Sequence, residues 1–189
     1  MALDNYANLK QSIKLWSHRE DVVGEIVADA ITMAEQEIFY GENPLRMTEM
    51  ITESTTTATT QEVVLPDGLV ELISISILID DCYHLLESVP RQLLTTTLEG
   101  TPKFYTIKSG VVFDVIPDKP YTIKFNYFKK PAPLSDEAPT NIALSKYPMA
   151  YLFGGVAMAM MYAGEEDRMN EYVIRMRDVI SNANSSAEN

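Results

Sequence analysis

Apolar residues recur with a helical period near the start of the chain. The stripe of a first helix is formed by Tyr6, Leu9, Ile13 and Trp16. Asp4 or Asn5 is placed to cap this helix. A second helix is predicted after Ser17, which has capping-box spacing with Glu20, and the sequence GENP (41–44) is expected to end it.

The middle of the chain changes to the alternation that is typical of strands. In VELISISILID (70–80), one face of the predicted strand carries Ile73, Ile75, Ile77 and Ile79. FYTIKSGVVFDVIP (104–117) predicts a hairpin that turns at Ser109 and Gly110. In YTIKFNYF (121–128), the inward positions are Tyr121, Ile123, Phe125 and Tyr127. Connections this short favour antiparallel pairing.

Two further stretches of this middle part are less regular. TESTTTATTQ (52–61) is rich in threonine, which favours strands, so it is either an edge strand or a mobile loop. SVPRQLLTTTL (88–98) is predicted to contain a short helix with Pro90 in its first turn.

After KKPAPLSDEAPT (129–140) the pattern is helical to near the end of the chain. A short helix is predicted over 141–146, and a longer one begins at Pro148 and ends at Gly164. EEDRMNEYVIRMRDVI (165–180) predicts the last helix, with acids in its first turn and arginines later. SNANSSAEN (181–189) has no large apolar side chain and is expected to be disordered in the isolated chain.

Together these elements predict an α+β fold. The terminal helices are expected to pack as a bundle, with an inserted antiparallel β module that is either a meander or a small sandwich. The expected boundaries are 1–46 plus 131–184 for the bundle, 47–130 for the β module, and 185–189 for a flexible C-terminal tail.

The most apolar stretch is KYPMAYLFGGVAMAMMYAGEED (146–167), in which no residue from 147 to 163 is charged. Its length lies at the lower limit of the roughly 17–25 residues that a membrane-spanning helix needs. Pro148 and the glycine pair 154–155 interrupt it, and acidic residues follow at once, so no membrane span is predicted. The stretch is therefore either a central core helix or a helix partly covered by a second copy of the chain.

Composition narrows the class of protein. The 189 residues are 46% hydrophobic, which is enough for a packed core, and the formal net charge is -12. Such acidity argues against sequence-specific DNA binding, although it suits a passage through which DNA slides without sticking. The single cysteine, Cys82, excludes an internal disulfide and fits synthesis in a reducing cytosol, and the first residues do not resemble a signal peptide.

Positive charge is concentrated in one segment. Residues 100–130 contain six lysines against two acids, at positions 103, 108, 119, 124, 129 and 130. These lysines are either the solvated face of strands or a contact with an acidic partner or DNA.

No active site emerges from the motifs. Asp80 and His84 in DDCYH are four residues apart, yet two ligands do not make a metal site. There is no G-x-S-x-G motif and no glycine-rich phosphate loop. No enzyme activity, metal or cofactor is predicted; a small hydrolase or ligand-binding protein that uses Asp80, Asp81 and His84 is the alternative from another class.

Several stretches, taken in order, are similar to the head-to-tail adaptor (connector) proteins of tailed bacteriophages. They are NYANLKQSIKLWSHRED (5–21), VVLPDGLVELISI (63–75) and the long run that begins with YTIKFNYFKKPAPLSDEAPTN (121–141) and continues through 169. This run contains a strand that ends in aromatic residues, followed by a proline-rich turn and then by Tyr147-Pro148 and Tyr151-Leu152. Two stretches depart from the family pattern: PDG (66–68), where an acid followed by an aromatic is expected, and the threonine-rich segment from 52.

The resemblance implies a structural virion protein that is assembled in the bacterial cytoplasm and located at the head–tail interface. Such adaptors form a ring, typically of twelve copies, between the portal and the tail nozzle or tube, and DNA passes through the ring. A tail-side or fibre-attachment protein is the nearest alternative, with the β module as its binding part. The residues expected at interfaces with other copies or partners are Trp16, Tyr151, Gly154, Ala157, Tyr162, Lys124, Lys129, Lys130, Ser181 and Asn184.

Overall fold

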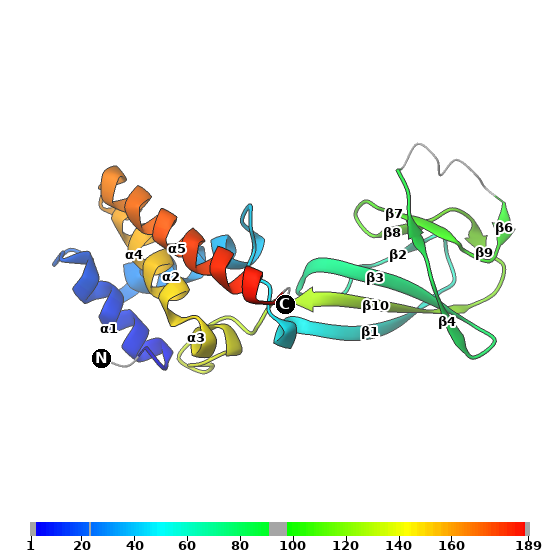
Figure 1. Cartoon of the computed structure of the whole chain (residues 1–189), viewed down its shortest axis with the longest axis horizontal. Coiled ribbons are helices and arrows are strands. Elements are labelled where there is room, and N and C mark those ends of the chain that lie inside the picture. Colours follow the sequence, from blue (N-terminus) through cyan, green and yellow to red (C-terminus); the bar gives the residue numbers. More distant parts are fainter. Residues whose placement is uncertain (1–2, 23, 91–97, 188–189) are drawn as a thin grey trace. The chain divides into compact units, whose positions relative to one another are not determined.

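The computed structural model describes residues 3–22, 24–90 and 98–187. Its contacts divide the chain into two compact units, each with its own core. The helical unit comprises Met1–Glu49 and Lys130–Asn189, and the β unit comprises Met50–Lys129. The α+β class is confirmed, because helices from both ends of the chain pack together and the sheets are inserted between them in sequence (Figure 1).

The predicted helices are present, although the start of α2 and the end of α5 differ from the prediction. They are α1 (Tyr6–Ser17), α2 (Gly24–Tyr40), the 3-10 turn η1 (Thr48–Met50), α3 (Ile142–Lys146), α4 (Pro148–Tyr162) and α5 (Glu166–Ala187). Asn5 is the N-cap of α1, since its side chain accepts a hydrogen bond from the Asn8 amide over 2.9 Å. Pro148 lies at the start of α4, and Gly164 follows its end with a φ of 72°.

The predicted capping box at Ser17 is wrong. Ser17 is the last residue of α1, it is buried, and its hydroxyl donates to the carbonyl of Lys14 over 2.7 Å. The turn is made instead by His18, whose positive φ of 52° ends the helix. Within the described residues, α2 begins only at Gly24.

Disorder from Ser181 onward is also a wrong prediction for residues 181–187, because α5 continues through Ala187. Two small side chains make this extension part of the fold. Ala183 is buried. The side-chain nitrogen of Asn184 donates to the carbonyl of Pro44 over 2.9 Å, and its side-chain oxygen accepts from the Arg46 backbone amide over 2.8 Å. Residues 188 and 189 lie outside the described part of the chain.

The described residues of the β unit form two four-stranded sheets and a two-stranded one. The first sheet has the order β1-β10-β3-β4, the second β2-β8-β7-β5, and β6 pairs with β9. The strands are β1 (Ile51–Ala58), β2 (Glu62–Val63), β3 (Leu69–Ile79), β4 (Cys82–Leu85), β5 (Glu87–Ser88), β6 (Glu99–Gly100), β7 (Phe104–Ile107), β8 (Val111–Phe113), β9 (Ile116–Pro117) and β10 (Tyr121–Lys129). The threonine-rich stretch is therefore an edge strand, β1. The strand order is not that of a meander, and two short pairs, β5–β7 and β6–β9, are parallel rather than antiparallel.

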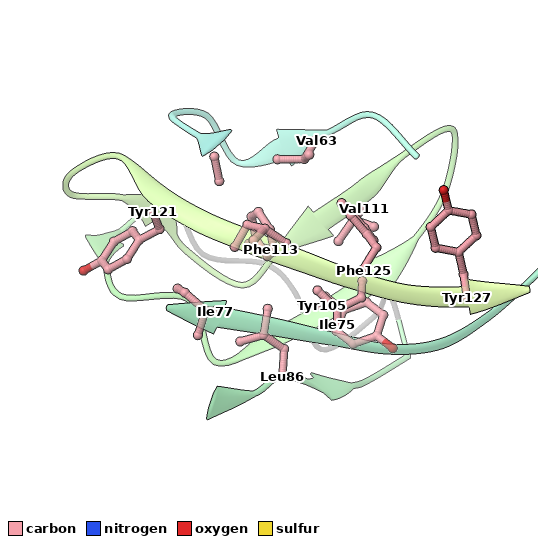
Figure 2. Packing of buried hydrophobic residues seen from close by; sticks show 12 residues of the cluster. Val63, Ile75, Ile77, Leu86, Tyr105, Val111, Phe113, Tyr121, Phe125 and Tyr127 are labelled. Atoms are coloured by element: carbon pink, nitrogen blue, oxygen red, sulfur yellow. The ribbon is translucent and has the colours of Figure 1, made fainter. Parts of the chain in front are cut away.

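Both large sheets contribute to one apolar core (Figure 2). Ile75, Ile77, Ile123 and Phe125 come from the first sheet, while Val111 and Phe113 come from the second. Of the two predicted arrangements, meander and small sandwich, a core shared by two sheets is typical of the sandwich. The predicted hairpin is confirmed, with Tyr105 opposite Phe113 and Ile107 opposite Val111.

In β3, one isoleucine that was predicted to share the buried face is exposed. Ile75 and Ile77 are buried, but Ile73 is 44% exposed. The pairing with β10 shifts between Asn126 and Tyr127, so that Tyr127 lies opposite Leu72 rather than Ile73. An extra residue in one strand reverses the side on which the following side chains point. The short helix predicted over 88–98 falls largely on 91–97, which lie outside the described residues.

Candidate functional site

The apolar run forms α4, which packs against the other helices of the helical unit. A Cβ at Gly154 would lie 2.9 Å from both the Ala34 Cβ of α2 and the Met176 sulfur of α5, and one at Gly155 would lie 2.3 Å from the Ile13 Cδ1 of α1. The glycine pair therefore lets three helices approach α4 closely. Most of this stretch is therefore a core helix within one chain, although Met161 and Tyr162 at its end stay exposed. No described helix is long and apolar enough to cross a membrane.

Three residues expected at an interface between copies are thus buried inside one chain. Tyr151 and Ala157 have no exposed surface, and Gly154 is also buried. Their assignment to an interface is wrong, since the other helices of the same chain already cover them. Asn184 is corrected for the same reason, because it is only 9% exposed and is hydrogen-bonded to residues 43–46.

Tyr151 belongs to a buried polar network. Its hydroxyl lies 3.4 Å from the carboxylate of Glu35, which is 2% exposed, and accepts a hydrogen bond from the side chain of Asn141 over 3.0 Å. The same carboxylate accepts from the Leu134 amide over 3.0 Å, and Asn141 caps α3 through the Leu144 amide. The network ties the returning segment 130–141 to α2 and α4.

Burial dominates the electrostatics of this network. It raises the pKa of Glu35, although the Leu134 amide, the charge of Lys130 and the Tyr151 hydroxyl oppose the rise. Burial, followed by the nearby Glu35 charge, also raises the pKa of Tyr151 well above its usual range. A lone buried acid that is held by an amide and a phenol has a structural role here, since every contact it makes lies within the bundle.

Trp16 lies in an aromatic row on the surface of the helical unit. The Trp16 and Phe153 ring centroids are 6.1 Å apart, and Phe153 and Tyr172 are also 6.1 Å apart. The Arg175 guanidinium lies over the last two rings, at 5.9 and 5.6 Å from their centroids. Because Trp16 is 39% exposed, it does not complete the buried stripe of α1. It remains available to a partner.

Tyr162 borders an apolar hollow between α2 and α4. This α2–α4 hollow has a volume of about 220 Å³ and is lined by Ile26, Asp29, Ala30, Met33, Met158, Met161 and Tyr162. Tyr162 is 64% exposed, while Met33 and Met161 are each more than two-fifths exposed. Met33, which is out of phase with the buried stripe of α2, is the sequence signal for this surface, whereas Ile26 was expected on that stripe.

The three candidate lysines are divided between the two units. Lys124 pairs with Glu53 over 3.4 Å, and its ammonium lies 4.4 Å from the Tyr83 ring centroid, both contacts being within the β unit. Lys129 is exposed at the end of β10. Lys130 belongs to the helical unit, where it lies over the rings of Phe39 and Tyr40. Ser181 is exposed on α5.

The acidic pair near His84 has a conformational role. Asp80 and Asp81 both have positive φ, 48° and 61°, in the two-residue turn between β3 and β4. Such a turn matches the twist of the strands and favours Asp, Asn and Gly. The described residues contain no group of three or more His, Cys, Asp or Glu side chains that could hold a metal ion.

Comparison with protein families gives one match over nearly the whole chain. A family model described as SU10 adaptor protein matches residues 4–186, which include the described helices, apart from the last residue of α5, and the described strands. No curated protein matches the chain.

Proposed function

Since the chain belongs to the SU10 adaptor protein family, a family of phage head-to-tail adaptors, we propose that it forms a ring beneath the portal that joins the DNA-filled head to the tail nozzle or tube. The observation that carries this proposal is the match over residues 4–186. The family implies a structural role in the virion, and no catalytic family is indicated.

The surfaces of the helical unit support assembly with other copies. The α2–α4 hollow is apolar, and the aromatic row adds exposed ring surface elsewhere on the bundle. Apolar and aromatic residues of this kind are enriched at the centres of protein interfaces. We expect twelve copies in the ring, in keeping with the portal-binding role.

The charge of the protein suits a genome channel. A net charge of -12 per copy multiplies in a ring, and a negative bore repels the phosphates of passing DNA. We expect no sequence-specific contact with DNA. A contact of Lys124, Lys129 and Lys130 with a tail protein stays a further expectation for this segment.

Attachment of tail-side proteins or fibres is a second candidate, and the β unit supports it. Val64 and Leu85 are 81% and 74% exposed, which is unusual for large apolar side chains. In addition, β1 is an eight-residue edge strand paired without interruption to β10 on one side. An edge strand without proline or bulge is a template for pairing with another chain.

Assembly with the portal of the same phage is the direct test. The full-length chain is mixed with purified portal, and the copy number is counted by native mass spectrometry and by imaging of the complexes. A multi-copy ring bound to one end of the portal is expected. The chain alone serves as the control, since adaptor rings form on the portal. A chain that stays monomeric with the portal present contradicts the proposal, and density found only below the nozzle favours the tail-side alternative.

A further inference from the structure

The α2–α4 hollow has a complementary surface on the same unit. The outward face of α1 presents Gln11, Lys14, Leu15 and His18, and Leu15 is 56% exposed. We call these four residues the α1 face. Arg19 and Glu20 lie beside it, and Arg19 is already paired with Asp21 and Glu165, each over 2.8 Å. Lys14 has no ion pair with any described residue, so its charge is available to a partner.

The margin of the hollow carries the opposite charge. Asp29 lines it, and Glu25 lies one helical turn before Asp29 on the same face of α2. Both carboxylates are exposed, and neither forms an ion pair with a described residue. An apolar centre with acids at its edge is therefore complementary to a face with an exposed leucine beside a lysine.

The two surfaces lie on opposite flanks of α2. Gly24 borders α1, because it lines a hollow together with Lys10 and Lys14, whereas Met33 lines the α2–α4 hollow. Gly24 and Met33 are nine residues apart, which at 3.6 residues per turn is two and a half turns, so they point in opposite directions. One copy thus presents one surface on each side, and a contact between two different surfaces is the kind that repeats into a ring.

We propose that the α1 face of one copy docks into the α2–α4 hollow of the next copy, with Leu15 entering the hollow and Lys14 facing Asp29 and Glu25. The occupant is a second copy of this chain. At a net charge of -12 copies repel one another, and the contact forms where the lysine of one copy meets two acids of the next. The inference rests on the proposed ring and adds the two faces that build it.

Charge reversal on the portal-bound ring tests the pairing. Lys14→Glu and Asp29→Lys are made separately in the full-length chain, and ring formation with purified portal is titrated by native mass spectrometry. Each single change places like charges together and is expected to weaken assembly by at least about tenfold. An equimolar mixture of the two variants is expected to restore it, because every junction in an alternating ring then carries opposite charges. Lys108→Glu, which makes the same charge change at an exposed position of the β unit, is the control and is expected to assemble normally.

A second variant tests the apolar half of the contact. Leu15→Ser alters a side chain that is already more than half exposed, so the helical circular dichroism and the melting temperature should stay unchanged while assembly weakens. Normal assembly of Leu15→Ser, or of both charge variants, overturns the inference and leaves the proposed function standing. Rescue by the double change within one chain but not by the mixture also overturns it, since Lys14 and Asp29 would then act inside one copy. A wild-type chain that forms no ring on the portal refutes the proposed function itself.

Discussion

The helical unit and the β unit are stabilised in different ways. The helical unit surrounds one uncharged helix, α4, and buries a polar network around Glu35 and Tyr151. The β unit closes two sheets over an apolar cluster of twelve residues. One side-chain atom in the described part of the β unit, the Asn126 Oδ1, is buried without a hydrogen-bond partner.

The two units therefore fix the arrangement of their elements by different means. A buried network around Glu35 fixes the returning segment 130–141 within the helical unit. Buried polar groups that are fully paired specify one arrangement of the elements around them. In the β unit, the pairing of the strands sets the register, and β1 forms one edge of its sheet.

The largest expected effect separates the two cores. Phe125→Ala removes a side chain that is 1% exposed at the centre of the β cluster, and such truncations cost about 3–5 kcal/mol. We expect each unit to unfold on its own. Hydrogen exchange should then accelerate in β3, β8 and β10 while α4 stays protected. Equal acceleration in α4 would show that the two cores unfold together. Phe104→Ala in the same sheet system is the control, because Phe104 is 37% exposed.

The sequence was most informative where one element carries its own signal. The cap at Asn5, the proline at the start of α4 and the inward alternation of β10 all follow from local chemistry. Tertiary contacts decided the rest. The extension of α5 depends on Asn184 reaching residues 43–46, which are distant in sequence.

The strand order and the exposed surfaces could not be predicted from the sequence for the same reason, because both depend on contacts between residues that are distant in sequence. The bulge that exposes Ile73 arises from pairing with β10, about fifty residues away, and alternation alone does not reveal it. The interface candidates failed at Tyr151, Gly154 and Ala157 because an apolar helix is equally expected in a core and at an interface. The hollow beside Tyr162 depends on which flank of α2 is left uncovered.

The next effect tests how closely α4 is packed. Gly154→Leu adds a side chain where a Cβ alone would lie 2.9 Å from Ala34 and Met176, and overpacking of a filled core costs about 1–3 kcal/mol or more. Gly24→Leu is the matched control, because nothing lies within 4 Å of a Cβ there. Thermal unfolding should show a lower melting temperature for the first variant only. Identical melting of both would mean that the neighbouring helices yield without cost.

A smaller effect addresses the polar network that distinguishes the helical unit. Glu35→Leu leaves the buried Leu134 amide without its acceptor, which should cost about 1–3 kcal/mol, whereas Glu35→Gln retains an oxygen that can accept the bond. The pH dependence gives a separate readout. Because burial raises the folded-state pKa of Glu35, the folded protein binds this proton more tightly than the unfolded chain.

The contribution of Glu35 is therefore most favourable at low pH. It declines as the pH rises from the ordinary glutamate pKa through the raised one. Denaturant titrations across this window should show the wild type losing stability relative to Glu35→Gln. A constant difference between the two proteins would mean that Glu35 ionises as it does in water.

The smallest predicted effect concerns a cap on the surface of the bundle. Asn5→Ala removes the acceptor for the Asn8 amide at the start of α1, and the loss of such a cap costs about 1 kcal/mol. Asn5→Ser retains a side-chain oxygen at the cap and should recover most of this stability. Amide exchange in the first turn of α1 is the local measurement, and faster exchange is expected in Asn5→Ala alone. If both variants exchange at the wild-type rate, then the hydrogen bond from Tyr6 to the Pro139 carbonyl, at 2.6 Å, holds the start of α1 without the cap.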